Sequence, residues 1–349
     1  MKRVASVNTI NRLTKVQEGE HDTVDYRVHS LDHNQERISL WHELPLFAVD
    51  DDAKPTGALN FICEIPKYTR RKFEICTTEA GNPIKQDQKN GKPRVFSKGD
   101  IFFNYGCFPR TWEDPQHVPE DVGVGGDNDP LDVCEIGLRQ IPTGAVRQVK
   151  VLGVLCLIDD GEADWKVIAI DEEDRWAREL NDVQDVERLL PGTLDAVREW
   201  FRTYKIPDGK PENRFALGEE FMGVKYTMRV IRETHEAWKR LVKSSGGWRG
   251  DLSREASSQS LHRNLSVPSL EELDIDSDHQ AVCALLGEEA ASKASGSLGV
   301  PPPMACVEVK MSAAGGVVLG LKEGVKERVA VAGKETVPNL VAVDGALEF

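Results

Sequence analysis

Three aspartates packed into six positions are the residues with the clearest potential for chemistry. The stretch GGDNDPLD at residues 125–132 carries Asp127, Asp129 and Asp132 beside glycines and a proline. Carboxyl groups titrate near pH ~4, so at neutral pH the three repel one another unless a cation lies between them. Carboxylate oxygens suit Mg²⁺ or Mn²⁺ better than zinc or copper. The stretch predicts a metal-binding turn, although by itself it also fits an ordinary solvated surface turn.

Further charged residues lie on strand-like runs elsewhere. Asp159 and Asp164 belong to a second acidic turn, and Glu64 and Glu74 lie upstream of the first. If these groups converge, they outnumber the one or two carboxylates that a single Mg²⁺ uses, which indicates several metals bridged by a polyanion such as phosphate. Side chains suited to phosphoryl oxygens lie on the same runs: Lys72, Arg94, Lys166 and Lys205, with Tyr105 and Tyr204. Taken singly, each charge is more typical of a solvated strand face.

The elements that must position these residues are mostly strands. Short alternating or apolar runs predict strands at 26–28, 38–41, 60–66, 72–77, 149–158 and 166–170. A polar turn at 67–71 predicts that 60–66 pairs with 72–77 as a hairpin, and the acidic glycine turn at 159–164 predicts a second hairpin. Residues two apart share a strand face, so Lys72 should lie beside Glu74, and Asp164 beside Lys166.

Two helices are predicted downstream of the strands. An apolar stripe over 194–204 lies between Pro-Gly and Pro-Asp-Gly breakers, and a second helix is predicted over 225–242. Many strands followed by helices indicate an α+β, mainly β fold: a barrel or sheet with helices packed against it.

Composition narrows the classes of protein and of partner. The 349 residues carry a formal charge of −14, which argues against nucleic-acid and anionic-membrane partners. No stretch is apolar and long enough to span a membrane, and no signal-peptide core is visible. Seven scattered cysteines without a C-x-x-C pair favour reduced thiols. Residues 1–16 are basic and fit either a transit peptide or an ordinary flexible terminus, so a mitochondrial location is the alternative to a cytoplasmic one.

The composition changes after Ser244. From residue 249 to 348 no aromatic residue occurs, and Ser, Gly, Ala and Pro dominate, which is typical of disorder. Short strands are conceivable at 307–311 and 329–331. Arg263-x-x-Ser266 resembles a phosphorylation-dependent docking site for a partner protein. The predicted organisation is therefore an N-terminal extension 1–23, a catalytic domain 24–243 and a disordered tail 244–349.

Several longer motifs identify a family. The acidic stretch GDNDPLD at 126–132 resembles the signature of soluble family I inorganic pyrophosphatases. In register with it, motifs of the eukaryotic branch are matched by EIP at 64–66, NYG at 104–106, FPRTWEDP at 108–115, DWKVIAI at 164–170 and EWFRTYKIPDGKPEN at 199–213. The similarity runs from about residue 24 to about residue 241. Ile101 departs from the pattern, since many members carry tyrosine there, and one hydrogen bond near the phosphates is expected to be missing.

The resemblance implies an OB-like five-stranded β-barrel with packed helices that hydrolyses pyrophosphate to two orthophosphates with Mg²⁺, Mn²⁺ being a substitute. By motif match, Asp129 would be the general base. Metals would be held by Asp127, Asp132, Asp164, Asp159 and Glu74; phosphates would be held by Lys72, Arg94, Tyr105, Lys166, Tyr204 and Lys205; Glu64 would act from behind these groups. The eukaryotic branch also implies a homodimer. The rival hypothesis is a catalytically weak, pyrophosphatase-like subunit that serves protein–protein interaction; such a subunit should have lost acids or lysines.

Overall fold

The computed structural model describes residues 13–49, 55–244, 307–311 and 317–321. The strands are β1 (Thr14–Glu18), β2 (Arg27–Leu31), β3 (Arg37–Ile38), β4 (Phe47–Val49), β5 (Pro55–Ile65), β6 (Phe73–Ile75), β7 (Ile84–Gln86), β8 (Gln88–Lys89), β9 (Lys92–Pro93), β10 (Asn104–Cys107), β11 (Asp132–Glu135), β12 (Val146–Asp159), β13 (Glu162–Asp171), β14 (Arg214–Phe215), β15 (Met222–Gly223), β16 (Val307–Met311) and β17 (Val317–Leu321). The helices are α1 (Leu40–Glu43), α2 (Val183–Leu189), α3 (Thr193–Thr203) and α4 (Val224–Ser244), with 3₁₀ turns η2 (Ile206–Asp208) and η3 (Leu217–Glu219).

Five strands close into a barrel. Following hydrogen-bonded neighbours, the order is β12-β13-β11-β10-β5, and β5 pairs back with β12. Only the β11–β13 pair in this ring is parallel. Closure leaves no long free edge among these strands. The centres of β12 and β13 are apolar because both of their faces are buried. The predicted five-stranded barrel with packed helices is confirmed.

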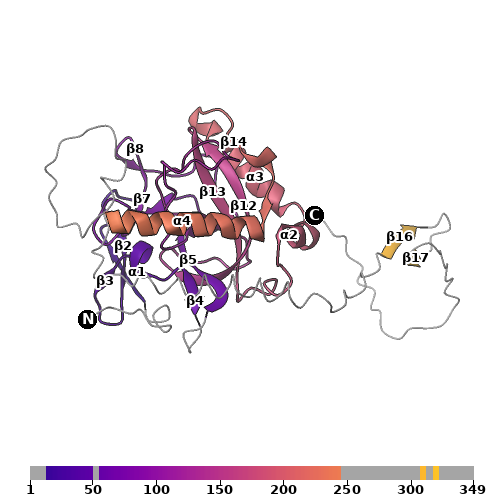
Figure 1. Cartoon of the computed structure of the whole chain (residues 1–349), viewed down its shortest axis with the longest axis horizontal. Coiled ribbons are helices and arrows are strands. Elements are labelled where there is room, and N and C mark those ends of the chain that lie inside the picture. Colours follow the sequence, from indigo (N-terminus) through magenta and orange to yellow (C-terminus); the bar gives the residue numbers. More distant parts are fainter. Residues whose placement is uncertain (1–12, 50–54, 245–306, 312–316, 322–349) are drawn as a thin grey trace. The chain divides into compact units, whose positions relative to one another are not determined.

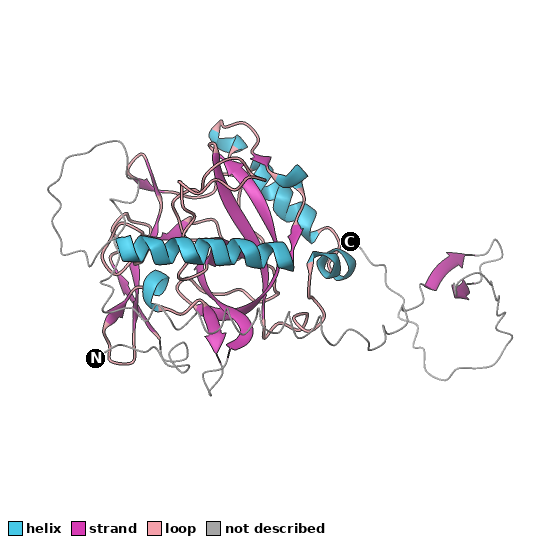
Figure 2. Cartoon of the chain, in the orientation of Figure 1, coloured by secondary structure: helices cyan, strands magenta, loops and turns pink. Residues whose placement is uncertain are grey.

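Alternate residues of the barrel strands pack on two faces. Val167 and Ala169 belong to a buried cluster with Val230 and Ile231 of α4, whereas Ile168 belongs to a second cluster with residues of α3. Figures 1 and 2 show α4 running past the barrel strands, with α2 and α3 near one end. Both faces of the sheet are therefore covered by helices.

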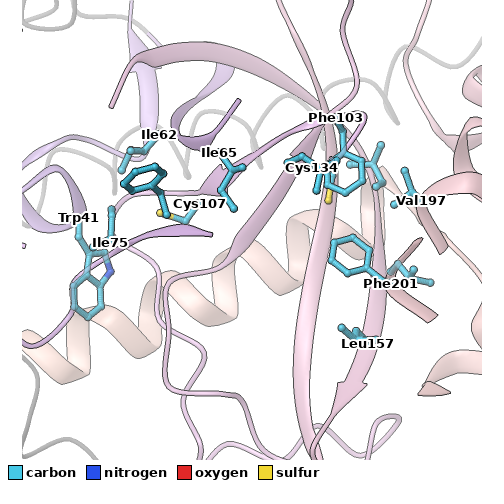
Figure 3. Close-up of a cluster of buried hydrophobic side chains, with 14 of the residues drawn as sticks. Trp41, Ile62, Ile65, Ile75, Phe103, Cys107, Cys134, Leu157, Val197 and Phe201 are labelled. Atoms are coloured by element: carbon cyan, nitrogen blue, oxygen red, sulfur yellow. The ribbon is translucent and has the colours of Figure 1, made fainter. Parts of the chain in front are cut away.

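The cluster that contains Ile168 packs beneath polar side chains of the barrel strands. Figure 3 shows Phe103 and Phe201 lying close together beside Val197, and the two rings are 5.7 Å apart. Burial of each such aromatic side chain contributes about 2 kcal/mol. Because these side chains are fully packed, the groups above them have little freedom to shift.

The predicted hairpins had different outcomes. The pairing of β12 with β13 across the acidic turn is confirmed. The pairing of 60–66 with 72–77 is wrong, because β5 is occupied by β4, β10 and β12 while β6 pairs with β7. The strand predicted at 38–41 is also wrong beyond Ile38: the Ser39 hydroxyl accepts the His42 N–H and caps α1 instead.

The helices predicted over 194–204 and 225–242 are confirmed as α3 and α4. Within the described residues, none of the helices is sufficiently long and apolar to cross a membrane. The five described cysteines are unpaired and buried, as predicted for reduced thiols.

The chain divides into two units, residues 1–290 and 291–349. In the second unit, β16 and β17 form an antiparallel hairpin, which confirms the strand at 307–311. Residues 1–12, Ser266, the strand at 329–331 and most of the predicted disordered tail lie outside the described residues. The division of the chain at residues 23 and 243 stays a prediction.

Candidate active site

Charged side chains from five parts of the chain surround one cavity of about 240 Å³. Eleven of the residues predicted from the sequence line it: Asp127, Asp129, Asp132, Asp159, Asp164, Lys72, Arg94, Tyr105, Lys166, Tyr204 and Lys205. Residues more than a hundred positions apart in the sequence thus converge, as a shared site requires. Charged side chains on strands are usually solvated one by one, so the gathering of these eleven residues around one cavity indicates a common site.

The acidic loop is held by close backbone approach. A Cβ at Gly125 would lie 2.1 Å from the Pro115 carbonyl oxygen, and one at Gly126 would lie 2.5 Å from the Glu113 backbone, so only glycine fits at either position. The Asp129 N–H donates to Asp127 Oδ1 at 3.1 Å. The glycines therefore pack the start of the loop against the segment around Glu113 while Asp129 stays exposed, so the loop is held more tightly than an ordinary surface turn.

Three barrel strands place the centre of the site. Asp132 at the start of β11 is the register partner of Lys166 on β13, and Asp164 lies two residues earlier on the same face. Lys166 is 2% exposed, and its Nζ donates to both carboxylates and, at 2.9 Å, to the Tyr105 hydroxyl. The Tyr105 hydroxyl in turn donates to Asp132. The predicted pairing of Asp164 with Lys166 on one strand face is confirmed.

A second group lies where β12 ends and α3 ends. The Tyr204 hydroxyl donates to Asp159 Oδ2 at 2.9 Å, and Lys205 Nζ donates to Asp159 and, at 3.1 Å, to Asp160. Tyr204 is the C-cap residue of α3 and its ring stacks on Trp200 at 5.1 Å. The helix end thereby aims a hydroxyl and an ammonium at the same carboxylate.

A third group lies at β6 and the turn that follows β7. Lys72 Nζ lies 2.6 Å from Glu74 Oε2 and 3.4 Å from Asp87 Oδ2, and Arg94 Nη1 lies 2.8 Å from the same Asp87 oxygen. Glu74 is not among the lining residues of the cavity but is tied to one that is. Asp87 was missed by the sequence analysis, because a lone acid near a short hairpin carries no local signal.

Glu113 was missed as well, although it lies inside the FPRTWEDP motif. A ligand oxygen from each of Glu113, Asp127 and Asp164 lies within 4.8 Å of the others. Glu113 Oε1 accepts the Trp165 N–H at 2.9 Å, while its buried Oε2 has no partner among the described residues. An unpartnered buried carboxylate oxygen beside two further carboxylates fits a hard divalent cation.

The pKa values of these acids are raised. The pKa of Asp164 is raised to about 7. Burial is the main cause, Lys166 opposes it, and the neighbouring Asp132 and Asp159 contribute to the rise. Asp129 also has a pKa raised to about 7, by lost hydration inside the pocket and by Glu74, although part of its surface stays open. Burial and neighbouring carboxylates raise the pKa of Asp127 and Glu113 well above the usual range. Bound cations would remove this mutual repulsion.

Glu64 lies behind the cavity and does not line it. It is 4% exposed, and its Oε1 accepts the Ile75 N–H at 2.6 Å, which ties β5 to β6. Burial, then Asp132, raises its pKa well above the usual range. Ile101, at the position where tyrosine was expected, is buried in the cavity wall beside Phe103 and offers no hydrogen bond from its side chain.

Comparison with known proteins gives one consistent family. A family model described as inorganic pyrophosphatase matches residues 61–239. The inorganic pyrophosphatase of Kluyveromyces lactis is 50% identical over 245 residues, covering 68% of this chain and 84% of that protein. Soluble inorganic pyrophosphatase 6, chloroplastic, of Arabidopsis thaliana is 49% identical over 255 residues, covering 72% of this chain and 82% of that protein.

A solved structure agrees with these sequence matches. The recombinant inorganic pyrophosphatase of Trypanosoma brucei brucei superposes with a TM-score of 0.64 at 47% identity, covering 67% of this chain and 71% of that one. A truncated vacuolar soluble pyrophosphatase of Trypanosoma cruzi, solved in complex with PPi, gives 0.63 at 47% identity, covering 66% of this chain and 92% of that one. Together with the barrel and the carboxylate-lined cavity, these matches establish that the chain belongs to the inorganic pyrophosphatase family.

Proposed function

We propose that the cavity is the catalytic site at which this chain hydrolyses inorganic pyrophosphate to two orthophosphates with the help of Mg²⁺. One observation carries the proposal: carboxylates for cations and cationic side chains for phosphates converge on a single cavity of about 240 Å³. Pyrophosphate is recognised by charge and geometry, so such a site needs no apolar slot for an organic group.

The donor set supports divalent cations as the cofactor. Asp127, Asp132 and Asp164 would hold one group of cations, and Asp159 with Glu74 would hold cations that accompany the substrate. Glu113, with its unpartnered buried oxygen, would complete the first group. All these donors are hard oxygens, which favours Mg²⁺ and accepts Mn²⁺. When bound, such cations lower the pKa of coordinated water and neutralise charge on the phosphoryl group.

The chain's own residues would carry the remaining steps. Asp129 would accept a proton from the attacking water. The water oxygen would bond to one phosphorus while the bond from that phosphorus to the bridging oxygen breaks. Lys72, Arg94, Lys166 and Lys205 would offset the negative charge that builds on the departing phosphate, and Tyr105 and Tyr204 would donate hydrogen bonds to phosphoryl oxygens. Glu64 would act indirectly, by fixing β6 through the Ile75 N–H.

The rival reading, a weak subunit kept for protein binding, is not favoured. A pocket that had lost its activity should have lost acids or lysines, and all the predicted ones are retained. The substitution at Ile101 removes one hydrogen-bond donor and leaves every charged group in position.

The test is phosphate release by the purified full chain. We expect turnover of pyrophosphate with Mg²⁺, its loss when EDTA is added, and its return when Mg²⁺ is restored; Mn²⁺ should support slower turnover. A folded chain that releases no phosphate with either cation would contradict the proposed function.

Two further properties are part of the proposal. We infer a homodimer, as the resemblance to the eukaryotic branch implies, and light scattering should give twice the 38.8 kDa chain mass; a monomer at working concentrations would contradict it. For location we propose the cytoplasm, with mitochondria as the alternative. Two relatives are named as chloroplastic forms, so members of the family differ in compartment.

A further inference from the structure

A second cavity, of about 350 Å³, lies in the same unit and shares no lining residue with the active-site cavity. It is bounded by β1, by the loop before β2, by the segment that enters β6, and by residues just before β12. Its lining includes Lys15, His21, Tyr26, Arg71, Phe73 and Thr143. Its volume is in the range of pockets that hold small organic molecules.

The charge of this cavity is opposite to that of the chain. The protein carries a net charge of −14, yet the described lining residues include Lys15, Arg71 and His21 and no carboxylate. Lys15 Nζ donates one hydrogen bond to the Thr143 carbonyl oxygen at 3.1 Å, so its two other protons are available to a ligand. Arg71 binds Asp22 through Nε and Nη2, and its Nη1 has no partner in the described part of the chain. The available donors favour an anion.

One wall is aromatic. The His21 and Tyr26 rings lie 4.2 Å apart with a 32° tilt, and Tyr26 meets Phe73 edge-on at 5.9 Å. Tyr26 is 3% exposed, and no described residue hydrogen-bonds its hydroxyl. The Tyr26 hydroxyl is therefore a hydrogen-bond donor that is available to a ligand in the cavity.

We propose that this cavity binds a small phosphate monoester that carries a planar ring, as a nucleoside monophosphate does. The phosphate would lie between Lys15 and Arg71 and accept the Tyr26 hydroxyl proton in a hydrogen bond. The ring would lie against the wall of His21, Tyr26 and Phe73. A bare orthophosphate would leave most of the 350 Å³ unfilled.

The position of the cavity couples it to the catalytic site. Successive side chains of an extended segment point to opposite faces, so Arg71 and Phe73 line this cavity while Lys72 and Glu74 face the active-site cluster. The segment is fixed to its neighbour through the Lys72 N–H and the Arg94 carbonyl at 3.1 Å. A ligand that pulls on Arg71 therefore acts on the backbone that carries Lys72, and its binding should change the KM for pyrophosphate. This coupling rests on the proposed function, whereas the binding does not.

Binding is tested on the full chain by calorimetric titration in EDTA, with adenosine 5′-monophosphate and orthophosphate as separate probes. Chelation removes the metals through which a phosphate would reach the catalytic cavity. We expect the monophosphate to bind at least about tenfold more tightly than orthophosphate, with Lys15→Glu weakening it at least about tenfold and Tyr26→Phe about threefold. The control is Arg232→Glu, an equal charge reversal at an exposed position on α4, which should leave binding unchanged.

Three results would contradict the proposed binding site or its ligand. Absence of binding by either probe at millimolar concentration would overturn the site, and equal affinity for the two probes would overturn the assignment of a ring. Equal weakening by Lys15→Glu and Arg232→Glu would mean only a long-range charge effect and would also overturn the site.

Coupling is tested with Mg²⁺ present. We expect adenosine 5′-monophosphate to change the KM for pyrophosphate at least about twofold in the wild type and to have no effect in Lys15→Glu. A change that persists in Lys15→Glu would place the nucleotide in the catalytic cavity and contradict the coupling. Loss of hydrolysis in the wild type would contradict the proposed function while leaving the binding result intact.

Discussion

Each cationic side chain predicted to bind the substrate already has a carboxylate partner. Lys166 contacts Asp132 and Asp164, Lys205 contacts Asp159, and Lys72 contacts Glu74. Each of these cationic groups is thus paired before any ligand arrives, while the acids that line the cavity outnumber them. Binding of cations and pyrophosphate must exchange partners, the carboxylates turning to the metals and the ammonium groups to the phosphates. We therefore expect metal and substrate to assist each other's binding.

Asp87 is the best test of positioning among these pairs. Its Oδ2 lies 3.4 Å from Lys72 Nζ and 2.8 Å from Arg94 Nη1, so it contacts both of these proposed phosphate-binding groups. We expect Asp87→Asn to lower kcat/KM about tenfold, mainly through KM, since Arg94 loses its carboxylate partner and Lys72 keeps only Glu74. The control Asp185→Asn removes a half-buried acid of α2 that does not line the cavity, and it should change neither parameter. An unaltered KM in Asp87→Asn would contradict the positioning role.

Glu113 tests the metal site. Replacing it with Gln keeps the size but removes the charge of the unpartnered oxygen that lies with Asp127 and Asp164. The Mg²⁺ concentration for half-maximal activity should rise about tenfold. Glu120→Gln, at an exposed position of the same segment, is the control. If both variants need the same Mg²⁺ concentration as the wild type, Glu113 is not a ligand.

Candidate residues that belong to local motifs could be predicted from the sequence, whereas those defined by tertiary contacts could not. Asp127, Asp129 and Asp132 lie within six positions, so the repulsion between them is visible without a structure. Asp87 acts only because β6, β7 and the segment around Arg94 lie side by side. Glu113 lies in a recognised motif, but its role appears only when Trp165 is seen to occupy one of its oxygens.

At the scale of elements, we expected two strands joined by a short polar turn to pair as a hairpin. This prediction failed where one of the strands paired with other strands. A polar turn joins β5 to β6, yet β5 already pairs with β10 and β12 of the barrel and with β4 outside it. The β12–β13 hairpin was predictable because its turn, Asp160-Gly161, has both residues at positive φ, as a tight hairpin requires. Ser39 shows that a single capping hydroxyl can convert an apparently alternating run into a helical turn.

The pairing of β2 with the loop after β6 gives a pH-dependent contribution to stability. Arg27 binds Glu79 at 2.8 Å, and its side-chain hydrogen bonds lower the pKa of Glu79 from 4.5 to about 2. A lowered folded-state pKa means that the contribution is complete above 4.5 and is lost as the pH falls toward 2. In urea unfolding, Glu79→Gln should be less stable than wild type near neutral pH, and the difference should shrink below 4.5. A difference that is constant with pH would contradict this account.

At the scale of the whole molecule, one barrel brings distant segments to a single cavity. Neighbouring strands β10, β11 and β13 supply Tyr105, Asp132 and Lys166, of which Asp132 and Lys166 are register partners. The end of α3 brings Tyr204 from a later part of the chain. Order along the sequence could not show this closure, because it depends on the pairing of β5 with β12, in which Ile62 faces Val146 and Leu59 faces Val149. The resemblance to the inorganic pyrophosphatase family predicted the closed barrel instead.

The most direct test of the central claim is Mg²⁺-dependent release of phosphate from pyrophosphate by Asp129→Asn. If Asp129 accepts the proton of the attacking water, kcat should fall at least about a hundredfold while circular dichroism stays that of the wild type. The control Asp195→Asn, an exposed acid on α3, should retain full activity. Wild-type kcat in a folded Asp129→Asn protein would contradict the account.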